Sequence, residues 1–385
     1  MAEIKTCPPL TRASVQEATH RISTHIHRTP VLSSRYIDSI VSSPQSPQSL
    51  KGTEWEGQEP ATPRLRLLFK CENFQRIGAF KPRGAFNALL RFSEELARTN
   101  TVSADGKPEH GAASTIRIIS HSSGNHAQAV ALAAGELGLP AHIVMPSIST
   151  PAKIDATRAY GAEVHFSGPT PQERLKVVDA LMADPNFRNV FVPPYDHPDT
   201  MIGQGTLGLE LQEQASEVLP SGERLHGIVT PCGGGGMLSG VALSCQGTGI
   251  QVFGSEPSQD GADDCRRGLL AGQRIEKVSS LTIADGLRTP VGAIPWSVIS
   301  DPKLVAGMFA VTDDQIRRAL GLVLQRMKIL IEPSSAVPLA VALYNEDFRR
   351  IVEREHGPAG TYNLGLVVSG GNIDLKRIPE LVLLE

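Results

Sequence analysis

The chain has 385 residues, of which 41% are hydrophobic, and it carries a formal net charge of -3 with a pI near 6.4. This length suits one large or two moderate domains, and the nearly balanced charge excludes the overall basic field of a nucleic-acid-binding protein. Apolar runs never reach the roughly 18 uninterrupted residues of a membrane-spanning helix, so we expect no membrane insertion.

The five cysteines are odd in number and widely spaced, and no CxxC pair occurs. Such spacing argues against a zinc site and against a disulfide framework. The first residues of the chain also lack the apolar core of a secretory signal. We therefore expect a reducing, cytoplasmic location.

Short apolar runs alternate with longer amphipathic segments along the chain. The runs typical of buried strands are residues 66–70, 115–120, 141–145, 163–167, 227–231, 251–256 and 364–370. Helical periodicity between them is clearest in 125–138, 151–161 and 312–327, the last with Thr312 as an N-cap before an acidic first turn. This alternation predicts an α/β fold with largely parallel sheets.

Two polar segments, residues 42–63 and 99–114, have the composition of insertions. The first is rich in Ser, Pro, Gln and Gly, and the second is similar. Segments of this kind bury too little apolar surface to offset the entropy cost of ordering. We expect both to be mobile surface loops.

Ligands of parallel sheets bind beyond the carboxyl ends of the strands, so the residues that follow each strand are the candidates for a site. The stretch GAFKPRG (78–84) follows the strand predicted at 66–70 and places Lys81 between Phe80 and Pro82. Gly and Pro punctuate ordinary surface turns, which is one reading of this stretch. The other is a lysine held in place for chemistry.

Four consecutive glycines, Gly233 to Gly236, follow the strand predicted at 227–231 and precede a helix. Such a run costs backbone entropy and suits a place where the backbone must approach a ligand closely. A strand, a glycine loop and a helix start together form an anion site that fits a phosphate monoester. A tight structural turn is the alternative.

A cluster of polar groups follows the strand predicted at 115–120. Ser122, Ser123 and Asn125 bring hydroxyl and amide groups to the start of a helix, where free N–H groups suit a carboxylate. A serine N-cap is the alternative reading. Ser369 ends the last strong strand, and its hydroxyl can hydrogen-bond to a ring atom or a substrate.

An amine, a phosphate-binding loop and a carboxylate-binding loop form a coherent set. Together they indicate a lysine that condenses with an aldehyde cofactor carrying a phosphate, which is pyridoxal 5'-phosphate.

The chain resembles the fold-type II pyridoxal phosphate enzymes, the tryptophan synthase β-like group, and within it eukaryotic serine racemase and the serine/threonine dehydratases. The matching motifs, in the family's order over about residues 11–375, are FKCENFQRIGAFKPRGAFNAL (69–89), HSSGNHAQA (121–129), PCGGGGMLSG (231–240), TIADGL (282–287), MKILIEP (327–333) and VSGGNIDL (368–375). The resemblance implies two domains, each with a largely parallel twisted sheet flanked by helices, and the cofactor in the cleft between them. The large domain would comprise residues 1–98 and 199–385, and the small domain residues 110–198.

The resemblance also implies roles for individual residues. Lys81 would bind the cofactor covalently and act as acid or base on one face of the substrate α-carbon, with Ser123 acting on the other face. Phe80 would pack beside the cofactor ring, Asn125 would bind the ring hydroxyl, and Ser369 would face the pyridine nitrogen. The phosphate would be held by Gly233, Gly234, Gly235, Gly236 and Met237, and the substrate carboxylate by the loop of Ser122, Ser123, Gly124 and His126.

The reaction implied is racemisation of serine, dehydration of serine or threonine, or both, because the two reactions share removal of the α-proton. Dehydration of 3-hydroxyaspartate, or another β-elimination or β-replacement, is an alternative within the same chemistry. A non-catalytic binding protein is a remote alternative. A homodimer and a nucleotide effector are further properties that the resemblance suggests.

The family's divalent cation site departs from its usual spacing here. Glu256 matches the family's glutamate, but the position six residues later is Ala262, and the expected acidic pair follows it. If the alignment is shifted by two residues, the Asp264 carboxylate and the Ala262 carbonyl become the other ligands. These oxygen ligands suit Mg²⁺, with Ca²⁺ or Mn²⁺ as alternatives. An acidic surface turn is the alternative.

Tyr195, in the stretch PPYDHPD (193–199), stands where mammalian serine racemase carries an asparagine. Dehydratases of the family often carry an aromatic residue at this position. The substitution weakens the prediction that racemisation dominates over elimination.

Overall fold

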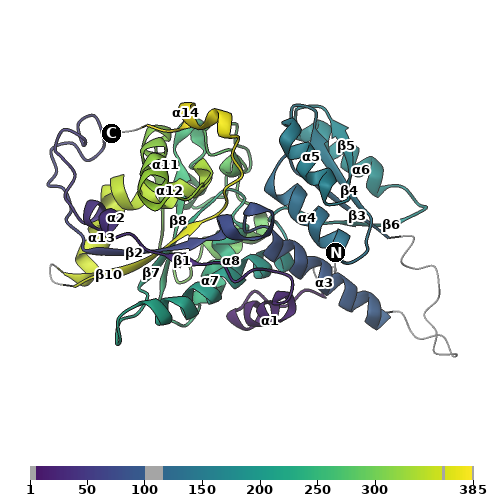
Figure 1. Cartoon of the computed structure of the whole chain (residues 1–385), viewed down its shortest axis with the longest axis horizontal. Coiled ribbons are helices and arrows are strands. Elements are labelled where there is room, and N and C mark those ends of the chain that lie inside the picture. Colours follow the sequence, from purple (N-terminus) through teal and green to yellow (C-terminus); the bar gives the residue numbers. More distant parts are fainter. Residues whose placement is uncertain (1–5, 100–115, 358–359, 384–385) are drawn as a thin grey trace.

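The computed structural model describes residues 6–99, 116–357 and 360–383 and contains two sheets flanked by helices (Figure 1). The larger sheet has the order β1-β2-β10-β7-β8-β9 and the smaller one the order β5-β4-β3-β6. The strands of the larger sheet are β1 Val31–Leu32, β2 Leu65–Cys71, β7 Gly227–Pro231, β8 Gln251–Pro257, β9 Gly307–Val311 and β10 Tyr362–Val368. Those of the smaller sheet are β3 Ile116–His121, β4 Ala141–Pro146, β5 Glu163–Ser167 and β6 Arg188–Phe191.

The strand pairing is parallel throughout both sheets except where β1 meets β2. Parallel strands are joined by crossover helices that cover the faces of the sheet. The carboxyl ends of the strands in each sheet therefore lie at one edge. The α/β fold class that the sequence predicted is confirmed.

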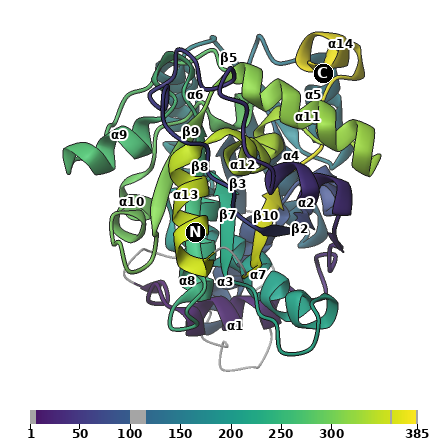
Figure 2. The same cartoon turned by 90° about the vertical axis from the view of Figure 1, so that its left-hand side faces the viewer.

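Helices cover both faces of each sheet. Against the larger sheet, α12 lies with α11 and α2 on one face, and α8 with α7 and α1 on the other (Figure 2). In the smaller sheet α4 packs with α3 and α5 against one face, and α6 covers the other. The helices are α1 Arg12–Ile22, α2 Arg35–Val41, α3 Pro82–Thr99, α4 Asn125–Glu136, α5 Pro151–Ala159, α6 Pro171–Met182, α7 Pro198–Val218, α8 Gly236–Cys245, α9 Asp264–Ala271, α10 Ala293–Ile299, α11 Asp313–Met327, α12 Pro333–Tyr344, α13 Glu346–His356 and α14 Ile378–Leu381.

Local sequence explains several of these boundaries. The Thr312 side chain accepts from the backbone N–H of Gln315, and Gln315 reaches back to the Thr312 N–H, so a capping box starts α11 where the N-cap was predicted. Pro82 opens α3, where its missing N–H is not needed. All seven predicted strands and all three predicted helices are confirmed. The short strands β1, β6 and β9 were not predicted.

The segment 42–63, predicted to be a mobile loop, is anchored to α13. The Nε1 of Trp55 donates to Asp347 at 3.0 Å, and the backbone N–H of Ala61 donates to the buried carboxylate of Glu346 at 2.8 Å. Leu50 and Trp55 are themselves buried. The segment therefore buries more apolar surface than its composition suggested, although its mobility stays a prediction. Residues 100–114 of the second insertion lie outside the described residues.

None of the helices that the structure describes is long and apolar enough to cross a membrane. The predicted domain boundaries stay a prediction.

Candidate active site

Lys81 lies directly before α3, and its Nζ donates a hydrogen bond to the carbonyl oxygen of Pro194 at 2.7 Å. Burial disfavours the charged amine and lowers the pKa of Lys81 to about 8, although the nearby Glu332 carboxylate opposes this shift. The Nζ also lies 5.0 Å from the centroid of the Phe80 ring. Because its pKa is lowered, a larger share of this amine is neutral near pH 7, which makes it a far better nucleophile than an exposed lysine.

The glycine loop joins β7 to α8, as predicted. Gly235 has a φ of 83°, in the left-handed region that favours glycine. A Cβ on Gly234 would collide with the Tyr195 ring, so only glycine fits beneath that ring. In the part of the chain that the structure describes, the backbone N–H groups of Gly233 to Met237 donate to no protein acceptor. Together with the positive end of α8, they form the donor set of an anion site.

The loop of Ser122 to Gly124 connects β3 to α4. The Ser122 hydroxyl accepts from the N–H of Gly124 at 3.1 Å, which fixes the loop internally. Gly124 is the N-cap of α4, and no side chain caps this helix, so the serine N-cap reading is wrong. Ser123 is partly exposed. Its hydroxyl therefore lies at the helix start without a capping role.

Asn125 connects this loop to the larger sheet. Its Nδ2 donates to both carboxylate oxygens of Glu332 at 3.2 Å, and its Oδ1 accepts from Asn372 at 2.8 Å. Burial and then the charge of Asp285 raise the pKa of Glu332 to about 7. Sequence reasoning gave Glu332 no role. One feature of the sequence could have pointed to Glu332. It is an acidic residue directly before Pro333, at the start of α12 in the motif MKILIEP.

His126 is buried behind the loop. Its Nε2 donates to the carbonyl oxygen of Val192 at 3.1 Å, and its Nδ1 has no partner among the described residues. Burial, aided by the charge of Lys81, lowers the pKa of His126 to about 3. The imidazole is therefore neutral and presents a lone pair, not a positive charge, on its free side.

Ser369 follows β10 directly and is buried. Its Oγ lies 3.0 Å from the Oγ of Ser335, and its carbonyl oxygen accepts from the N–H of Phe80 at 3.0 Å. The second bond ties the segment before Lys81 to the end of the central strand. Lys81, the glycine loop, the Ser122–Asn125 loop and Ser369 thus all follow carboxyl ends of strands, as predicted.

The predicted cation ligands lie after β8. The Glu256 carboxylate is buried and accepts from the N–H groups of Cys265 and Arg266 at 3.1 and 2.9 Å, and Asp264 accepts from the N–H of Val291 at 3.1 Å. Desolvation raises the pKa of Glu256 well above its usual value and that of Asp264 to about 6. Both oxygens of Glu256 are thus bound to backbone N–H groups, and the thiols of Cys232 and Cys265 lie beside this carboxylate. A divalent cation held by Glu256, Asp264 and the Ala262 carbonyl stays a prediction.

Comparison with known proteins identifies the kind of site. The family model of "Pyridoxal-phosphate dependent enzyme" matches residues 54–356. The chain belongs to the pyridoxal-phosphate-dependent enzyme family. It is 35% identical to serine racemase from Oryza sativa subsp. indica over 95% of this chain and 92% of that protein.

Two further members of the family are similar over nearly their full length. L-threo-3-hydroxyaspartate ammonia-lyase from Saccharomyces cerevisiae is 32% identical over 97% of this chain and 96% of that protein. The solved structure of maize serine racemase superposes with a TM-score of 0.77 at 34% identity, covering 96% of each chain. The pyridoxal-phosphate family fold thus extends over almost the whole chain.

The residues present fit the family's cofactor. The unpartnered backbone N–H groups of the glycine loop supply a phosphate cradle, and the desolvated amine of Lys81 supplies the group that condenses with an aldehyde. The Asn125 amide is bound here to Glu332 and Asn372, and the Ser369 hydroxyl lies 3.0 Å from Ser335 Oγ, so each would exchange a protein partner for a ring substituent.

Proposed function

We propose that this protein is a serine racemase, a serine/threonine ammonia-lyase, or both, dependent on pyridoxal 5'-phosphate. The observation that carries the proposal is the Lys81 amine, whose pKa burial lowers to about 8, on a chain that also presents a glycine-loop anion site. The serine racemases among the relatives support the choice of substrate. A non-catalytic role is disfavoured because a binding protein needs no desolvated amine.

The hydrogen-bonding groups at the site suggest a role for each residue toward the cofactor and the substrate. The N–H groups of Gly233 to Met237 would hold the phosphate, Asn125 the ring hydroxyl and Ser369 the pyridine nitrogen. The Ser123 N–H, with the hydroxyls of Ser122 and Ser123, would bind the substrate carboxylate, because the N–H groups of Ser122 and Gly124 already donate to Val144 and Ser122. The neutral His126 lies behind this loop. When bound, the cofactor supplies an electron sink for the charge that develops on the substrate α-carbon.

Two groups move the α-proton in this proposal. Lys81 Nζ removes or returns it on one face, and Ser123 Oγ serves the opposite face. Racemisation requires both groups, because the proton must leave one face and arrive on the other. Elimination requires one group for the α-proton and then loss of the β-hydroxyl. A serine hydroxyl at position 369 would not protonate the pyridine nitrogen as a carboxylic acid would.

A second candidate substrate is 3-hydroxyaspartate, and two cations favour it. A Cβ on Gly124 would lie 3.9 Å from Lys153 Nζ, so this ammonium sits at the carboxylate-binding loop, where it also pairs with Asp285 at 3.0 Å. The Arg174 guanidinium interacts electrostatically with His121 and Tyr195. Sequence reasoning did not place a cation here. The yeast relative is named for this activity.

The remaining elements of the proposal are less specific. A divalent cation, Mg²⁺ or alternatively Ca²⁺ or Mn²⁺, binds the carboxylates of Glu256 and Asp264 with the carbonyl of Ala262. The two-domain division at residues 98, 110 and 198, a homodimer, a nucleotide effector and a cytoplasmic location also stay proposals. All five cysteines are free thiols, which supports a reducing compartment.

A substrate panel tests the proposal. The purified enzyme, loaded with cofactor and supplied with Mg²⁺, is incubated with L-serine, L-threonine and L-threo-3-hydroxyaspartate, and D-amino acids and keto acids are measured. D-serine or pyruvate from serine supports the first proposal. Oxaloacetate from 3-hydroxyaspartate, with serine left unchanged, supports the second and contradicts the first.

A further inference from the structure

Two histidines and a glutamate gather on one face of the smaller sheet, away from the site described above. His142 is the second residue of β4, and Glu163 and His165 lie at the start of the edge strand β5. The parallel register pairs His142 with Glu163, and His165 follows on the same face because side chains alternate along a strand. The cluster therefore lies toward the amino ends of these strands, whereas the candidate active site lies beyond carboxyl ends.

The potential ligand atoms of the three side chains converge. His142 Nδ1 lies 2.9 Å from His165 Nε2, and each of these nitrogens lies 3.5 Å from an oxygen of the Glu163 carboxylate. In a tetrahedral zinc site with metal–ligand distances of about 2.0–2.2 Å, ligand atoms lie roughly 3.3–3.5 Å apart. The two distances to the Glu163 oxygens already lie in this range. The distance between the two nitrogens would have to increase by a few tenths of an ångström to reach it.

The protonation state of the cluster suits metal binding. Two ring nitrogens that face each other at 2.9 Å share one proton, so at least one of them presents a lone pair. Neutral imidazole is the form that binds metals. The Glu163 carboxylate is largely exposed, which leaves a path for an ion and room for a solvent ligand.

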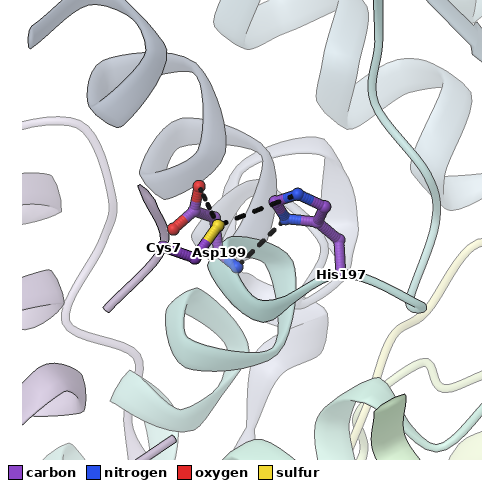
Figure 3. Close-up of side chains that lie close together, drawn as sticks. All are labelled: Cys7, His197 and Asp199. Atoms are coloured by element: carbon purple, nitrogen blue, oxygen red, sulfur yellow. Dashed lines mark hydrogen bonds between the residues drawn. The ribbon is translucent and has the colours of Figure 1, made fainter. Parts of the chain in front are cut away.

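A second cluster brings Cys7, His197 and Asp199 together (Figure 3). It differs from the first cluster in where its protons lie. The His197 Nδ1 accepts the backbone N–H of Asp199 at 3.2 Å, so a neutral ring carries its proton on Nε2, the atom that faces the Cys7 sulfur at 3.9 Å. Burial and the charge of Asp199 also raise the pKa of Cys7 to about 12. A protonated nitrogen and a protonated thiol must each release a proton before they bind a metal, which disfavours this cluster near neutral pH.

We propose that His142, Glu163 and His165 form a binding site for a divalent transition-metal ion of the zinc class, separate from the active site. Two imidazole nitrogens and one carboxylate oxygen match the ligand preference of zinc and copper and not that of Mg²⁺. Three protein ligands leave a fourth position for water. A bound ion would clamp the edge strand β5 to β4.

Calorimetric titration of the cofactor-loaded enzyme with Zn²⁺, in an excess of Mg²⁺ that fills oxygen-ligand sites, tests the proposal. The proposal predicts a site whose affinity falls by roughly 100-fold or more in His165→Gln and at least about tenfold in Glu163→Gln. Glu163 is largely exposed, so its variant should fold normally. Bound Zn²⁺ should raise the melting temperature of the wild type, and this rise should vanish in both variants.

Two control variants test whether Zn²⁺ binds at this site and not at other histidine or cysteine side chains. His25 pairs with a single carboxylate, that of Glu136, at 3.3 Å, so His25→Gln removes a His–Glu pair without a second imidazole. Cys7→Ser removes the thiol of the other cluster. Neither control should change Zn²⁺ affinity at the proposed site. Zn²⁺ affinity and melting shift that are the same in His165→Gln as in the wild type would overturn the proposal.

Discussion

Lys81 Nζ is held by the carbonyl oxygen of Pro194 at 2.7 Å, which joins the start of α3 to the turn that carries Tyr195. The next residue, Tyr195, lies with its ring against Gly234 of the glycine loop. One short turn between β6 and α7 thus contacts both the reactive amine and the proposed phosphate cradle. We therefore expect a change at position 195 to affect the glycine loop while the Lys81 amine stays in place.

Substitution of Lys81 by alanine should remove the visible absorbance of the bound cofactor and all turnover, because no other amine takes its place. Fold and melting behaviour should change little, since the substitution removes a desolvated amine and one hydrogen bond. Absorption spectroscopy and circular dichroism measure the two effects. The exposed Lys176→Ala is the matched control and should keep the band. A Lys81→Ala protein that retains the band would contradict the assignment.

Cofactor uptake by the cofactor-free protein should depend on pH through Lys81. Because its pKa is lowered from 10.5 to about 8, the reactive neutral amine increases as pH rises toward that value, and about a tenth is already neutral at pH 7. Stopped-flow absorbance should show an uptake rate that rises with pH, reaches half its maximum near pH 8 and levels off about one unit higher. Glu332→Gln removes a charge that raises the Lys81 pKa, so the midpoint should move to lower pH. A rate still rising steeply above about pH 10 would indicate an ordinary lysine.

Ser123→Ala should separate racemisation from elimination. Loss of the hydroxyl removes the proposed acid or base of one face, so formation of D-serine from L-serine should fall by about 10²–10⁴-fold. Pyruvate formation from L-serine should fall much less if Lys81 alone removes the α-proton. Chiral chromatography and a keto-acid assay on one reaction mixture measure both products. An unchanged ratio of D-serine to pyruvate would contradict the role of Ser123.

Lys153→Ala and Arg174→Ala should act selectively on a dicarboxylic substrate. Each substitution removes a cation near the carboxylate-binding loop, and kcat/KM for 3-hydroxyaspartate should fall by roughly tenfold or more, while that for serine changes less. Arg158→Ala, on the same helix as Lys153, is a control of similar charge. Equal losses for both substrates would show that these cations only support the loop.

Removal of divalent cation should destabilise the protein more as pH rises. Burial raises the pKa of Asp264 from 3.8 to about 6, so without a cation the folded state holds a proton that the unfolded state releases, and stability falls as pH rises from about 4 to about 6. Bound Mg²⁺ would favour the ionised carboxylates and cancel this loss. Melting temperatures with Mg²⁺ and with chelator should therefore diverge toward neutral pH.

The matched variants for this prediction are Glu256→Gln, which should abolish the effect of Mg²⁺, and the exposed Glu276→Gln, which should not. Identical melting curves with Mg²⁺ and with chelator near pH 7 would exclude an occupied site.

The features predicted from sequence are those that a short segment specifies by itself. The buried strands, the capping box at Thr312, the glycine loop and the stretch around Lys81 depend on neighbours within a few residues. Glu332 was missed because its role depends on Asn125 from a distant part of the chain. The anchoring of segment 42–63 was missed for the same reason, since its partners Glu346 and Asp347 lie on α13. Composition carries no information about such long-range partners.

The proposal that this enzyme acts on serine can be tested by incubating the cofactor-loaded enzyme with L-serine and Mg²⁺ and measuring D-serine and pyruvate together. One or both products should form in the wild type, and neither should form in Lys81→Ala. An enzyme that holds the cofactor on Lys81 but forms neither product from L-serine would contradict the proposal.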